Sequence, residues 1–456
     1  MQLILLSGGS GKRLWPLSND SRSKQFLKVL HNKNNDKESM IQRVCRQLKE
    51  NNLLDKSIVS TSKGQVEIIK NQIGDDMPIV IEPSRRDTFP AIALSTSYLL
   101  SKSVINKEDV VIVLPVDAYV DNSFFKKVKE LEKTLIESKA DIALLGVTPS
   151  SPSEKFGYIV PEETIHSHYL HVDYFQEKPT KEVAKHLIEK NALWNCGVFC
   201  FKAEYLIKLL TQNGYSYEYD DLFNFYNDLS KNSFDYEVVE KTKNIVVLPY
   251  DGSWKDLGTW NSLTDEMNYS LTGKGIISED SIGSKVINEL DIPITLIGIE
   301  NAIVAASPDG ILVTNREASP TIKEYIGEFN NRPMYEERRW GWYKVLEYVK
   351  YEEGNEVLTK RIGINAGSNL SYQLHFKRTE TWTVLKGEGI LLLEGKPFHL
   401  RIGDTITIPL GKKHALKAIT VMEILEVQSG IELVEDDVHR ISLNWEEIIA
   451  EHQLSS

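Results

Sequence analysis

Short apolar runs alternate with longer amphipathic segments through residues 1–265, and this alternation constrains the fold more than any other feature of the sequence. Apolar runs rich in branched side chains are typical of parallel strands, which are buried on both faces, and the helically spaced segments between them fit crossover helices. The alternation predicts an α/β domain with a mostly parallel sheet. The expected strands cover 3–7, 57–61, 110–116 and 142–147, and the expected helices cover 65–73 and 123–138.

The rest of the chain carries strand signals almost throughout. Residues 266–330 hold short β-rich runs, which predict a small β element, and 327–339 has the polar composition of a linker. From 340 to 435, glycines recur at eight-residue intervals between apolar runs, which is typical of a small antiparallel barrel or jelly roll. The strands expected in these two regions cover 284–287, 293–299, 302–306, 310–315, 343–351, 357–364, 381–386, 389–393, 405–409 and 422–428, and a last helix covers 445–453. We therefore predict three units, 1–265, 266–330 and 331–456.

The chain has 456 residues, with 53 basic and 65 acidic side chains and a formal net charge of -12. The negative charge argues against a general nucleic-acid or anionic-membrane binder, which needs a positive field. Three cysteines, Cys45, Cys196 and Cys200, are too few for a disulfide framework and indicate core thiols in a reducing compartment. The apolar start is too short for a signal peptide, and no apolar stretch approaches the length of a membrane span. We expect a cytoplasmic protein, and the sequence leaves a homo-oligomer open.

The first expected strand leads directly into the turn Gly8-Gly9-Ser10-Gly11-Lys12-Arg13. This turn is not the dinucleotide fingerprint, because Leu14 stands at the place of the third glycine. It is not a P-loop either, because Leu6 and Arg13 replace that motif's first glycine and its Ser or Thr. Glycines let backbone N–H groups approach a phosphate closely, and the two cations of the turn can offset its charge. The alternative is a plain tight turn with exposed charges.

Three further side chains fit a phosphate-handling site. Lys24 brings another cation soon after the turn, and Asp117 follows a buried strand at the edge where open α/β sheets bind ligands. Asp256 follows a β-run over 244–248. Two carboxylates can share one Mg²⁺, which prefers a few hard oxygens together with substrate phosphates. Taken singly, each aspartate is more often a turn or cap residue.

At this point the sequence resembles the mannose-1-phosphate guanylyltransferases, also called GDP-mannose pyrophosphorylases. The run 6–18 followed by Lys24-Gln25-Phe26 looks like the opening signature of that family, and later motifs come in the family's order. Those motifs are Glu82-Pro83, Arg86, Pro90-Ala91-Ile92-Ala93, Phe156-Gly157-Tyr158-Ile159, Phe175-Gln176-Glu177-Lys178-Pro179, Trp194-Asn195-Cys196-Gly197 and the run 253–260 around Asp256. As a set they cover nearly all of residues 1–265.

The resemblance implies a Rossmann-like nucleotidyltransferase domain that binds GTP, mannose-1-phosphate and Mg²⁺. Such an enzyme positions its reactants and neutralises charge, so it needs no covalent nucleophile. The implied catalytic residues are Arg13, Lys24, Asp117 and Asp256, of which the two aspartates hold the Mg²⁺. The implied nucleotide-binding residues are Gly8, Gly9, Gly11, Lys12, Arg13, Glu82, Arg86 and Asp87. The implied sugar-phosphate-binding residues are Gly157, Glu177, Lys178, Asn195 and Gly197, with Lys178 at the phosphate.

The sequence departs from the family pattern at two places, and the first lies near the family's nucleotide-binding side. The family usually reads Gly-Arg-Asn-Thr where this chain has Arg85-Arg86-Asp87-Thr88, and Asp-His where it has Asp117-Ala118. Because Asp87 can still accept hydrogen bonds from guanine N1–H and N2–H₂, GTP stays the first expectation. The alternatives are the same chemistry with another nucleoside triphosphate or sugar-1-phosphate, and a non-catalytic sugar-nucleotide sensor. A sensor would not need both metal carboxylates.

The region from Arg339 onward resembles the cupin half of bifunctional enzymes that add a type II mannose-6-phosphate isomerase to the transferase. The segment before it, 266–330, resembles that family's short β-helix-like connecting piece. The matching motifs are Tyr372-Gln373-Leu374-His375, Arg378, Glu380, Trp382, Ile408-Pro409-Leu410-Gly411, His414 and Glu426-Val427-Gln428-Ser429-Gly430. The resemblance implies a metal site of Gln373, His375, Glu380 and His414, an N/O ligand set that suits Zn²⁺ or another divalent ion.

The cupin half also departs from its family. Lys377 and Thr381 stand where the family has His, and the closing Asp-x-Tyr-Gly-Arg stretch is absent from 441–445. An ammonium beside the ligands repels a divalent cation unless it points away. Two interpretations stay open, an isomerase that interconverts mannose-6-phosphate and fructose-6-phosphate, and a structural or regulatory barrel. A separate cluster of His166, His168 and His171 is expected in an exposed hairpin turn.

Overall fold

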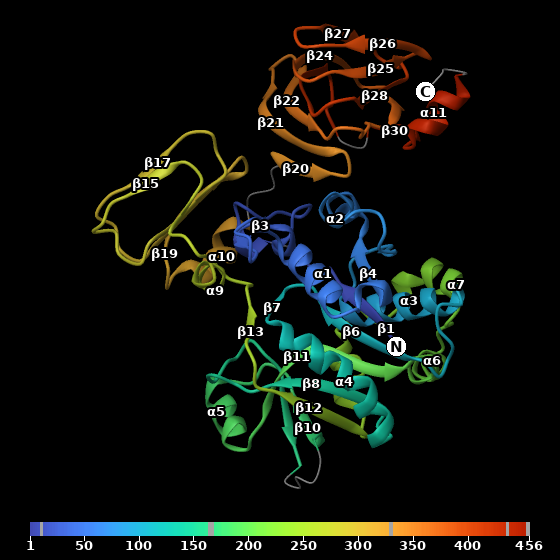
Figure 1. The fold of residues 1–456 in the computed structure, drawn as a ribbon, viewed down its shortest axis with the longest axis vertical. Helices are drawn as coiled ribbons and strands as arrows, with labels where there is room; N and C mark the ends of the chain where they lie inside the picture. The colour runs from blue at the N-terminus through green and yellow to red at the C-terminus, as the bar shows by residue number, and fades with distance from the viewer. Residues whose placement is uncertain (10–11, 163–167, 328–331, 435–436, 453–456) are drawn as a thin grey trace.

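A computed structural model of the chain describes residues 1–9, 12–162, 168–327, 332–434 and 437–452. Figure 1 shows three parts, with an α/β domain at the bottom, a small β segment on the left and a carboxy-terminal β-domain at the top. Within the described ranges, no helix has the length and apolar character needed to cross a membrane.

The α/β domain is built on a nine-stranded sheet in the order β5-β4-β1-β6-β11-β8-β12-β10-β9. Four neighbouring strands at one side, from β5 to β6, are parallel, as the sequence predicts. The expectation of a mostly parallel sheet is wrong for the other side, because β11 runs antiparallel to both β6 and β8, and β10 runs antiparallel to β12 and β9. The strands are β1 (Gln2–Leu6), β4 (Ser57–Ser62), β5 (Ile79–Glu82), β6 (Val110–Pro115), β8 (Ile142–Val147), β9 (Tyr158–Pro161), β10 (Leu170–Gln176), β11 (Leu193–Lys202) and β12 (Ile245–Tyr250).

Helices cover both faces of this sheet and bury two apolar cores. One core lies under α1, α2 and α4, and the other lies under α3, α6, α7 and α8. Helix α1 begins at a capping box, in which the side chains of Ser39 and Gln42 each accept the other residue's backbone N–H. The helices are α1 (Met40–Glu50), α2 (Val66–Ile73), α3 (Thr88–Ser101), α4 (Asn122–Ser138), α5 (Lys181–Glu189), α6 (Ala203–Gln212), α7 (Tyr219–Asn224), α8 (Phe234–Glu237) and α9 (Trp260–Asp265).

Short elements fill the connections that matter for the site. The 3-10 helices η1 (Lys12–Leu14) and η2 (Lys24–Phe26) follow the glycine turn, and η4 (Lys63–Gln65) leads into α2. Two two-stranded sheets are added by β2 (Leu30–His31) with β3 (Lys37–Glu38) and by β7 (Ala118–Val120) with β13 (Trp254–Asp256).

Most elements expected in the α/β domain are confirmed within one or two residues, and α2 and α4 are the two expected helices. The three cysteines are buried free thiols, as predicted. Of the histidine cluster, His166 lies outside the described residues, His168 is exposed in a bend, and His171 is exposed within β10.

The small β segment stacks short strands in parallel, in the order β14-β16-β18, with β19 antiparallel at the edge and β15 pairing with β17. Its apolar side packs with η1 and α9 in one shared core. The elements are β14 (Leu271–Thr272), β15 (Gly275–Ile277), β16 (Lys285–Asn288), β17 (Ile294–Leu296), β18 (Ala302–Ser307), β19 (Gly310–Asn315), η7 (Ser319–Thr321) and α10 (Ile322–Ile326).

The β-domain packs a six-stranded sheet, β20-β21-β22-β29-β24-β27, and a five-stranded sheet, β26-β25-β28-β23-β30, both antiparallel. Its six expected strands are present, and β23, β26, β28 and β30 are additional. The elements are β20 (Tyr335–Arg338), β21 (Gly341–Lys350), β22 (Glu356–Ile364), β23 (Tyr372–Leu374), β24 (Arg378–Lys386), β25 (Gly389–Leu393), β26 (Lys396–Leu400), β27 (Thr405–Ile408), β28 (His414–Ala418), β29 (Met422–Gly430), β30 (His439–Ser442) and α11 (Trp445–Glu451).

Strand β20 corrects the prediction of a linker over 327–339. Its charged residues are not solvated, because Glu336 and Glu337 are buried, Glu336 pairs with Arg338, and Glu337 accepts from Lys28 of the α/β domain at 2.9 Å. Strand β20 therefore has the charged composition of a linker, but its side chains form part of the interface with the α/β domain.

The contact between the domains, which we call the α2 seam, joins helix α2 to strand β20 (Figure 1). Gln72 Nε2 donates to Glu337 Oε2 at 3.1 Å, and Asn71 Nδ2 donates to the carbonyl of Arg338 at 2.8 Å. Glu67 Oε2 accepts the backbone N–H of Arg339 at 3.3 Å. The β-domain is therefore held against the α/β domain by polar contacts.

Candidate active site

The glycine turn follows β1 at the carboxyl end of the parallel strands, where α/β sheets bind ligands. Gly9 has a φ of +126°, which favours glycine, and a Cβ atom added at Gly8 or Gly9 would meet no atom within 4 Å. The backbone of the turn is therefore open to a ligand. Gly11 and the side chain of Lys12 lie outside the described part of the chain.

A buried hydrogen-bond network supports the backbone of the turn through the carbonyls of Ser7 and Gly9. Ser23 Oγ donates to the Gly9 carbonyl at 2.8 Å, and Gln65 Nε2 donates to Ser23 Oγ at 2.7 Å and to the Gly9 carbonyl at 3.3 Å. Thr61 Oγ1 donates to the Ser7 carbonyl at 3.1 Å. Sequence reasoning missed these supporting residues, because Thr61 and Gln65 belong to a different strand and helix and carry no local motif.

Lys24 lies between the two aspartates that were predicted to share a metal. Its Nζ is 2.8 Å from Asp117 Oδ2 and 2.7 Å from Asp256 Oδ1. The pairing of β13 with β7 brings the aspartates together, because it sets Asp256 opposite Ala118, the neighbour of Asp117. Burial alone would lower the pKa of Lys24, but the two carboxylates raise it above its ordinary value.

These two carboxylates fit a divalent cation. Both reach one ammonium nitrogen, so their oxygens are close enough to share a single ion, and the side chains are 37% and 32% exposed. Hard oxygen ligands at the edge of an open cleft are what Mg²⁺ prefers, since it keeps several waters or phosphate oxygens in its shell.

An open cleft of about 510 Å³ runs beside the turn. It brings together six of the predicted residues and adds others that the sequence did not single out, among them Lys231. The lining residues are Leu6, Gly8, Gly9, Ser60, Ser62, Glu82, Arg85, Arg86, Asp87, Thr88, Ala91, Pro115, Asp117 and Lys231. Arg13 is exposed and is not among these lining residues; its charge lowers the pKa of Lys323 in α10.

The wall of the cleft opposite the turn is held by buried polar contacts. Glu82 accepts the Tyr226 hydroxyl at 2.8 Å, and burial raises the pKa of the Glu82 carboxyl. Arg86 donates to the Leu229 carbonyl at 2.7 Å. Asp87 has a φ of +72° and caps α3 through its Oδ1, which accepts the N–H of Thr88 at 2.8 Å. The strained backbone of Asp87 is the kind found at ligand sites.

The five predicted sugar-phosphate residues also lie together. Gly157 has no room for a side chain, because a Cβ there would lie 2.3 Å from Glu177 Oε2. The Gly157 carbonyl accepts the N–H of Asn195 at 2.8 Å, and Asn195 Oδ1 accepts the N–H of Gly197 at 3.1 Å. Lys178 pairs with Glu177.

Asp235 of α8 belongs to the same cluster, although sequence reasoning missed it. Its Oδ1 accepts Asn195 Nδ2 at 2.5 Å. Burial, together with the nearby Glu177 carboxylate, raises the pKa of Asp235 to about 6. The only sequence signal available was an acidic residue beside an apolar helix start, which is too common to single out.

The β-domain forms a second candidate site from His375, Glu380 and His414, all buried, whose ligand atoms lie within 4.8 Å of one another. His375 Nε2 is 3.2 Å from Glu380 Oε1, and His414 Nε2 is 3.7 Å from Glu380 Oε2. The Nδ1 atoms are within hydrogen-bond distance of the Asp437 and Lys412 carbonyls, at 2.6 and 2.9 Å.

That arrangement fits a metal site. A carbonyl partner at Nδ1 fixes the tautomer that leaves an Nε2 lone pair toward a metal. Burial lowers the pKa of His375 and His414, which favours the neutral, ligating form. Glu380 Oε2 and His414 Nε2 are buried without a hydrogen-bond partner among the described residues. Gln373, the fourth predicted ligand, lies beside the set: its Nε2 is 3.3 Å from His375 Nε2, and its Oε1 accepts the Ser371 hydroxyl at 2.6 Å.

The predicted obstacle at Lys377 is absent, because its ammonium points to the surface and pairs with Glu432. The cation that does adjoin the ligands is Arg378, whose Nε donates to Glu380 Oε1 at 2.9 Å. The Glu426 carboxyl lies in the same cavity, where burial and the charge of Glu380 raise its pKa to about 7. Its oxygens accept from Trp382 Nε1 at 3.0 Å and Gln428 Nε2 at 2.7 Å.

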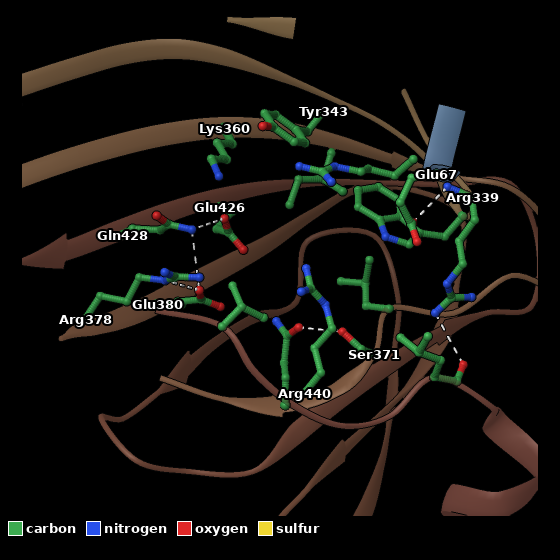
Figure 2. Close-up of a pocket in the computed structure, with 17 residues that line it drawn as sticks. Glu67, Arg339, Tyr343, Lys360, Ser371, Arg378, Glu380, Glu426, Gln428 and Arg440 are labelled. Atoms are coloured by element: carbon green, nitrogen blue, oxygen red, sulfur yellow. Dashed lines mark hydrogen bonds and ion pairs between the residues drawn. The ribbon is translucent and has the colours of Figure 1, made fainter. Parts of the chain in front are cut away.

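The cavity of the β-domain is small, about 90 Å³, and is shown in Figure 2. Basic and acidic side chains face one another across it, and Arg440 reaches into it from β30 (Figure 2). Glu67 of α2 lines its edge beside Arg339, so the α/β domain contributes to its wall (Figure 2).

Comparisons with known proteins match both halves of the chain. The family model for nucleotidyl transferases matches residues 2–273, and the model for the mannose-6-phosphate isomerase C-terminal region matches residues 330–443. Mannose-1-phosphate guanylyltransferase from Salmonella muenchen is 27% identical over 475 residues, covering 96% of this chain and 97% of that protein. The enzyme of the same name from Klebsiella pneumoniae is 29% identical over 486 residues, covering 96% and 98%.

Among solved structures, the crystal structure of mannose-1-phosphate geranyltransferase from Thermus thermophilus aligns with a TM-score of 0.60 and 23% identity. The alignment covers 72% of this chain and 99% of that one. The likeness shows a shared fold.

Proposed function

This chain belongs to the nucleotidyl transferase family, and from that premise we propose that it transfers GMP from GTP to mannose-1-phosphate, yielding GDP-mannose and pyrophosphate. The observation that carries the proposal is the placement of Lys24 between Asp117 and Asp256 at the end of the open glycine turn. Curated relatives that bear this activity in their names align along 96% of the chain.

The chemistry needs positioning and charge neutralisation. An oxygen of the sugar phosphate attacks the α-phosphorus of GTP in line, and pyrophosphate leaves. Backbone N–H groups of the turn hold the triphosphate, and the Lys24 ammonium neutralises charge that develops on it. Asp117 and Asp256 would hold Mg²⁺, which when bound supplies further charge neutralisation to the phosphates.

The cleft would bind the nucleotide, and the separate cluster around Glu177 would bind the sugar phosphate. Glu82, Arg86 and Asp87 line the side that we assign to the nucleoside, where the Asp87 carboxylate can accept from guanine N1–H and N2–H₂. Glu177, Lys178 and Asn195 would bind mannose-1-phosphate, with the Lys178 ammonium at its phosphate. Buried free thiols support the cytoplasm as the compartment of this reaction.

Pyrophosphate release tests the proposal directly. The purified full chain is incubated with Mg²⁺ and every pairing of four NTPs with several sugar-1-phosphates. We expect release with GTP and mannose-1-phosphate. Release with CTP or UTP and not with GTP would overturn the assignment of the base, and release with no pair would overturn transfer itself.

We propose as a second function that the β-domain interconverts mannose-6-phosphate and fructose-6-phosphate. The buried set of His375, Glu380 and His414, with Gln373 beside it, supports a divalent ion such as Zn²⁺ there. A coupled isomerase assay with added Zn²⁺, Mn²⁺ or Co²⁺ tests this function. We expect activity that disappears in His375→Ala; a β-domain inactive with all three metals would instead support a structural or regulatory role.

A further inference from the structure

Three separate elements converge on one carboxylate cluster beside the end of β6. Glu177 and Lys178 follow β10, Asn195 lies on β11, and Asp235 belongs to α8. The neighbouring Gly197 sits against Pro115, the last residue of β6 and two positions before Asp117. The cluster therefore adjoins the Lys24 and Asp117 contact on the side that we assign to the sugar phosphate.

Asn195 serves this cluster through contacts within the protein. Its Nδ2 donates to Asp235 Oδ1 at 2.5 Å, and its Oδ1 accepts the N–H of Gly197 at 3.1 Å. Strand β11 is irregular between Asn195 and Phe199, and Gly197 takes a φ of +74° there. The Asn195 amide thus secures the irregular strand to Asp235, and both of its polar ends already have protein partners.

One oxygen of the Glu177 carboxylate has no hydrogen-bond donor within the described protein. That oxygen, Oε2, is buried. Lys178 is the cation that pairs with Glu177, so Glu177, Asp235 and Lys178 together carry one net negative charge when all are ionised. Burial and Glu177 raise the pKa of Asp235, which is the expected result of placing two carboxylates close together.

Neutral hydroxyl groups suit such a cluster better than any charged group. A hydroxyl donates a hydrogen bond to a carboxylate without adding charge, whereas another carboxylate would add repulsion in a partly buried site. A hexose ring presents several adjacent hydroxyls. The phosphate of the same molecule would lie toward Lys178, Lys24 and the metal carboxylates.

We propose that Asp235 determines sugar specificity: with Glu177 it accepts hydrogen bonds from the ring hydroxyls, and the pair selects neutral hexose-1-phosphates against hexuronate-1-phosphates. The inference rests on the proposed transferase function and extends it, because it names a further residue and the class of sugar that the site rejects.

Steady-state kinetics of Asp235→Asn test the assignment. The substitution keeps the shape of the side chain and removes its charge. We expect KM for mannose-1-phosphate to rise about 10-fold or more, while KM for GTP stays within about twofold. Preference for mannose-1-phosphate over a hexuronate-1-phosphate, measured as the ratio of kcat/KM values, should fall about 10-fold. Asp228→Asn is the matched control, because Asp228 is exposed on the neighbouring 3-10 helix η5 (Tyr226–Asp228).

The outcomes separate this inference from the proposed function. Wild-type sugar KM and unchanged sugar preference in a folded Asp235→Asn variant would overturn the inference and leave transfer standing. A purely structural role would lower the melting temperature and kcat without altering the preference ratio.

The wild-type protein gives a second test that no folding defect can obscure. Mannose-1-phosphate and a hexuronate-1-phosphate are titrated as competitors of the reaction, and the uronate should bind at least about 10-fold more weakly. Equal binding of the two would also overturn the inference. Absence of pyrophosphate release from the wild type with every substrate pair would instead count against the transferase function.

Discussion

The two candidate sites use the same ingredients, carboxylates beside a cationic side chain, in opposite settings. In the α/β domain, Asp117 and Asp256 share Lys24 at the edge of a cleft of about 510 Å³, and both aspartates are about a third exposed. In the β-domain, Glu380, His375 and His414 are all buried, and Glu380 lines a cavity of about 90 Å³ together with Arg378. The carboxylates of the first site are therefore partly exposed beside a large cleft, whereas the carboxylate of the second is buried beside a small cavity.

The setting changes what the charges do. In the α/β domain, Asp117 and Asp256 each keep about a third of the side-chain surface exposed, so a metal ion or a phosphate can reach this site beside Lys24. In the β-domain, burial lowers the pKa of both histidines and favours their neutral form, and Glu380 Oε1 accepts a hydrogen bond from Arg378 Nε. The comparison teaches that partly exposed carboxylates stay accessible to incoming substrates, whereas the buried ligand set is held in place by its protein contacts.

The largest expected effect comes from Asp117→Asn in the open site. Removing one of two metal carboxylates should lower kcat for pyrophosphate release about 1000-fold, because charge neutralisation is the main contribution to this chemistry. The fold should survive, since the side chain is partly exposed. Asp251→Asn, at an exposed aspartate in the loop before β13, is the control. Near-normal turnover in Asp117→Asn would mean that the metal lies elsewhere.

Glu380→Gln should have the next largest effect, and it should affect only the buried metal-ligand set of the β-domain. The affinity of the protein for Zn²⁺ should fall about 100-fold. Less Zn²⁺ should therefore remain bound after dialysis, as measured by mass spectrometry. The variant also leaves the buried Arg378 with only its longer contact to Asp437 Oδ2 at 3.8 Å, which should destabilise the β-domain by about 3 kcal/mol in denaturant unfolding. Transferase activity should stay near that of the wild type. Unchanged metal retention would contradict the ligand assignment.

The pH dependence of the sugar site should be smaller, about 10-fold. A carboxyl with a pKa of about 6 is ionised above that pH and protonated below it. KM for mannose-1-phosphate should therefore rise about 10-fold from about pH 7.5 to about pH 5, as the Asp235 carboxylate is lost. The other titratable groups around this cluster are Glu177, Lys178, Tyr236 and Glu240.

The sugar phosphate itself titrates with a pKa of about 6, so the wild-type profile alone is ambiguous. The pH profile of KM in Asp235→Asn serves as the reference, because it contains the titration of the substrate phosphate without that of Asp235. The two profiles should diverge as the pH falls. Parallel profiles would exclude Asp235 as the titrating group.

The smallest expected effect lies between the two sites, at the α2 seam. Glu337→Gln removes the charge that accepts from Lys28 and Gln72 and should lower the free energy of unfolding by about 1 kcal/mol. Turnover at either site should change less than twofold. Glu353→Gln, at an exposed turn of the β-domain, is the control. A large loss of transfer activity in Glu337→Gln would show that the sites are less independent than their contrast suggests.

Sequence reasoning was most successful where a residue and its signal are local. Asp117 directly follows the predicted strand β6, which placed it at the ligand edge of the sheet. Its approach to Asp256 depends on the pairing of β13 with β7, which the sequence did not predict. The apolar runs of β4, β6 and β8 likewise predicted strands directly. The direction of β11 was not predictable, because a buried strand has the same composition whether it runs parallel or antiparallel to its neighbours.

Residues that act through distant partners were missed. Gln65 looks like an ordinary polar residue before a helix, yet it is buried against the carbonyl of Gly9. Asp235 acquires its raised pKa from burial and from Glu177, which lies on another element. Lys377 gives the opposite lesson, since its place in the family motif suggested a clash with the metal ligands, and only its side-chain direction removes it.

The start of α2 ties the two sites together. Gln65 turns inward to the backbone of Gly9, and Glu67 turns outward to the edge of the β-domain cavity. A nucleotide at the turn and a ligand in the cavity therefore act on neighbouring positions of one short segment. Thermodynamic linkage is reciprocal: any change that a bound nucleotide makes to the binding free energy of the second ligand equals the change that the second ligand makes to nucleotide binding.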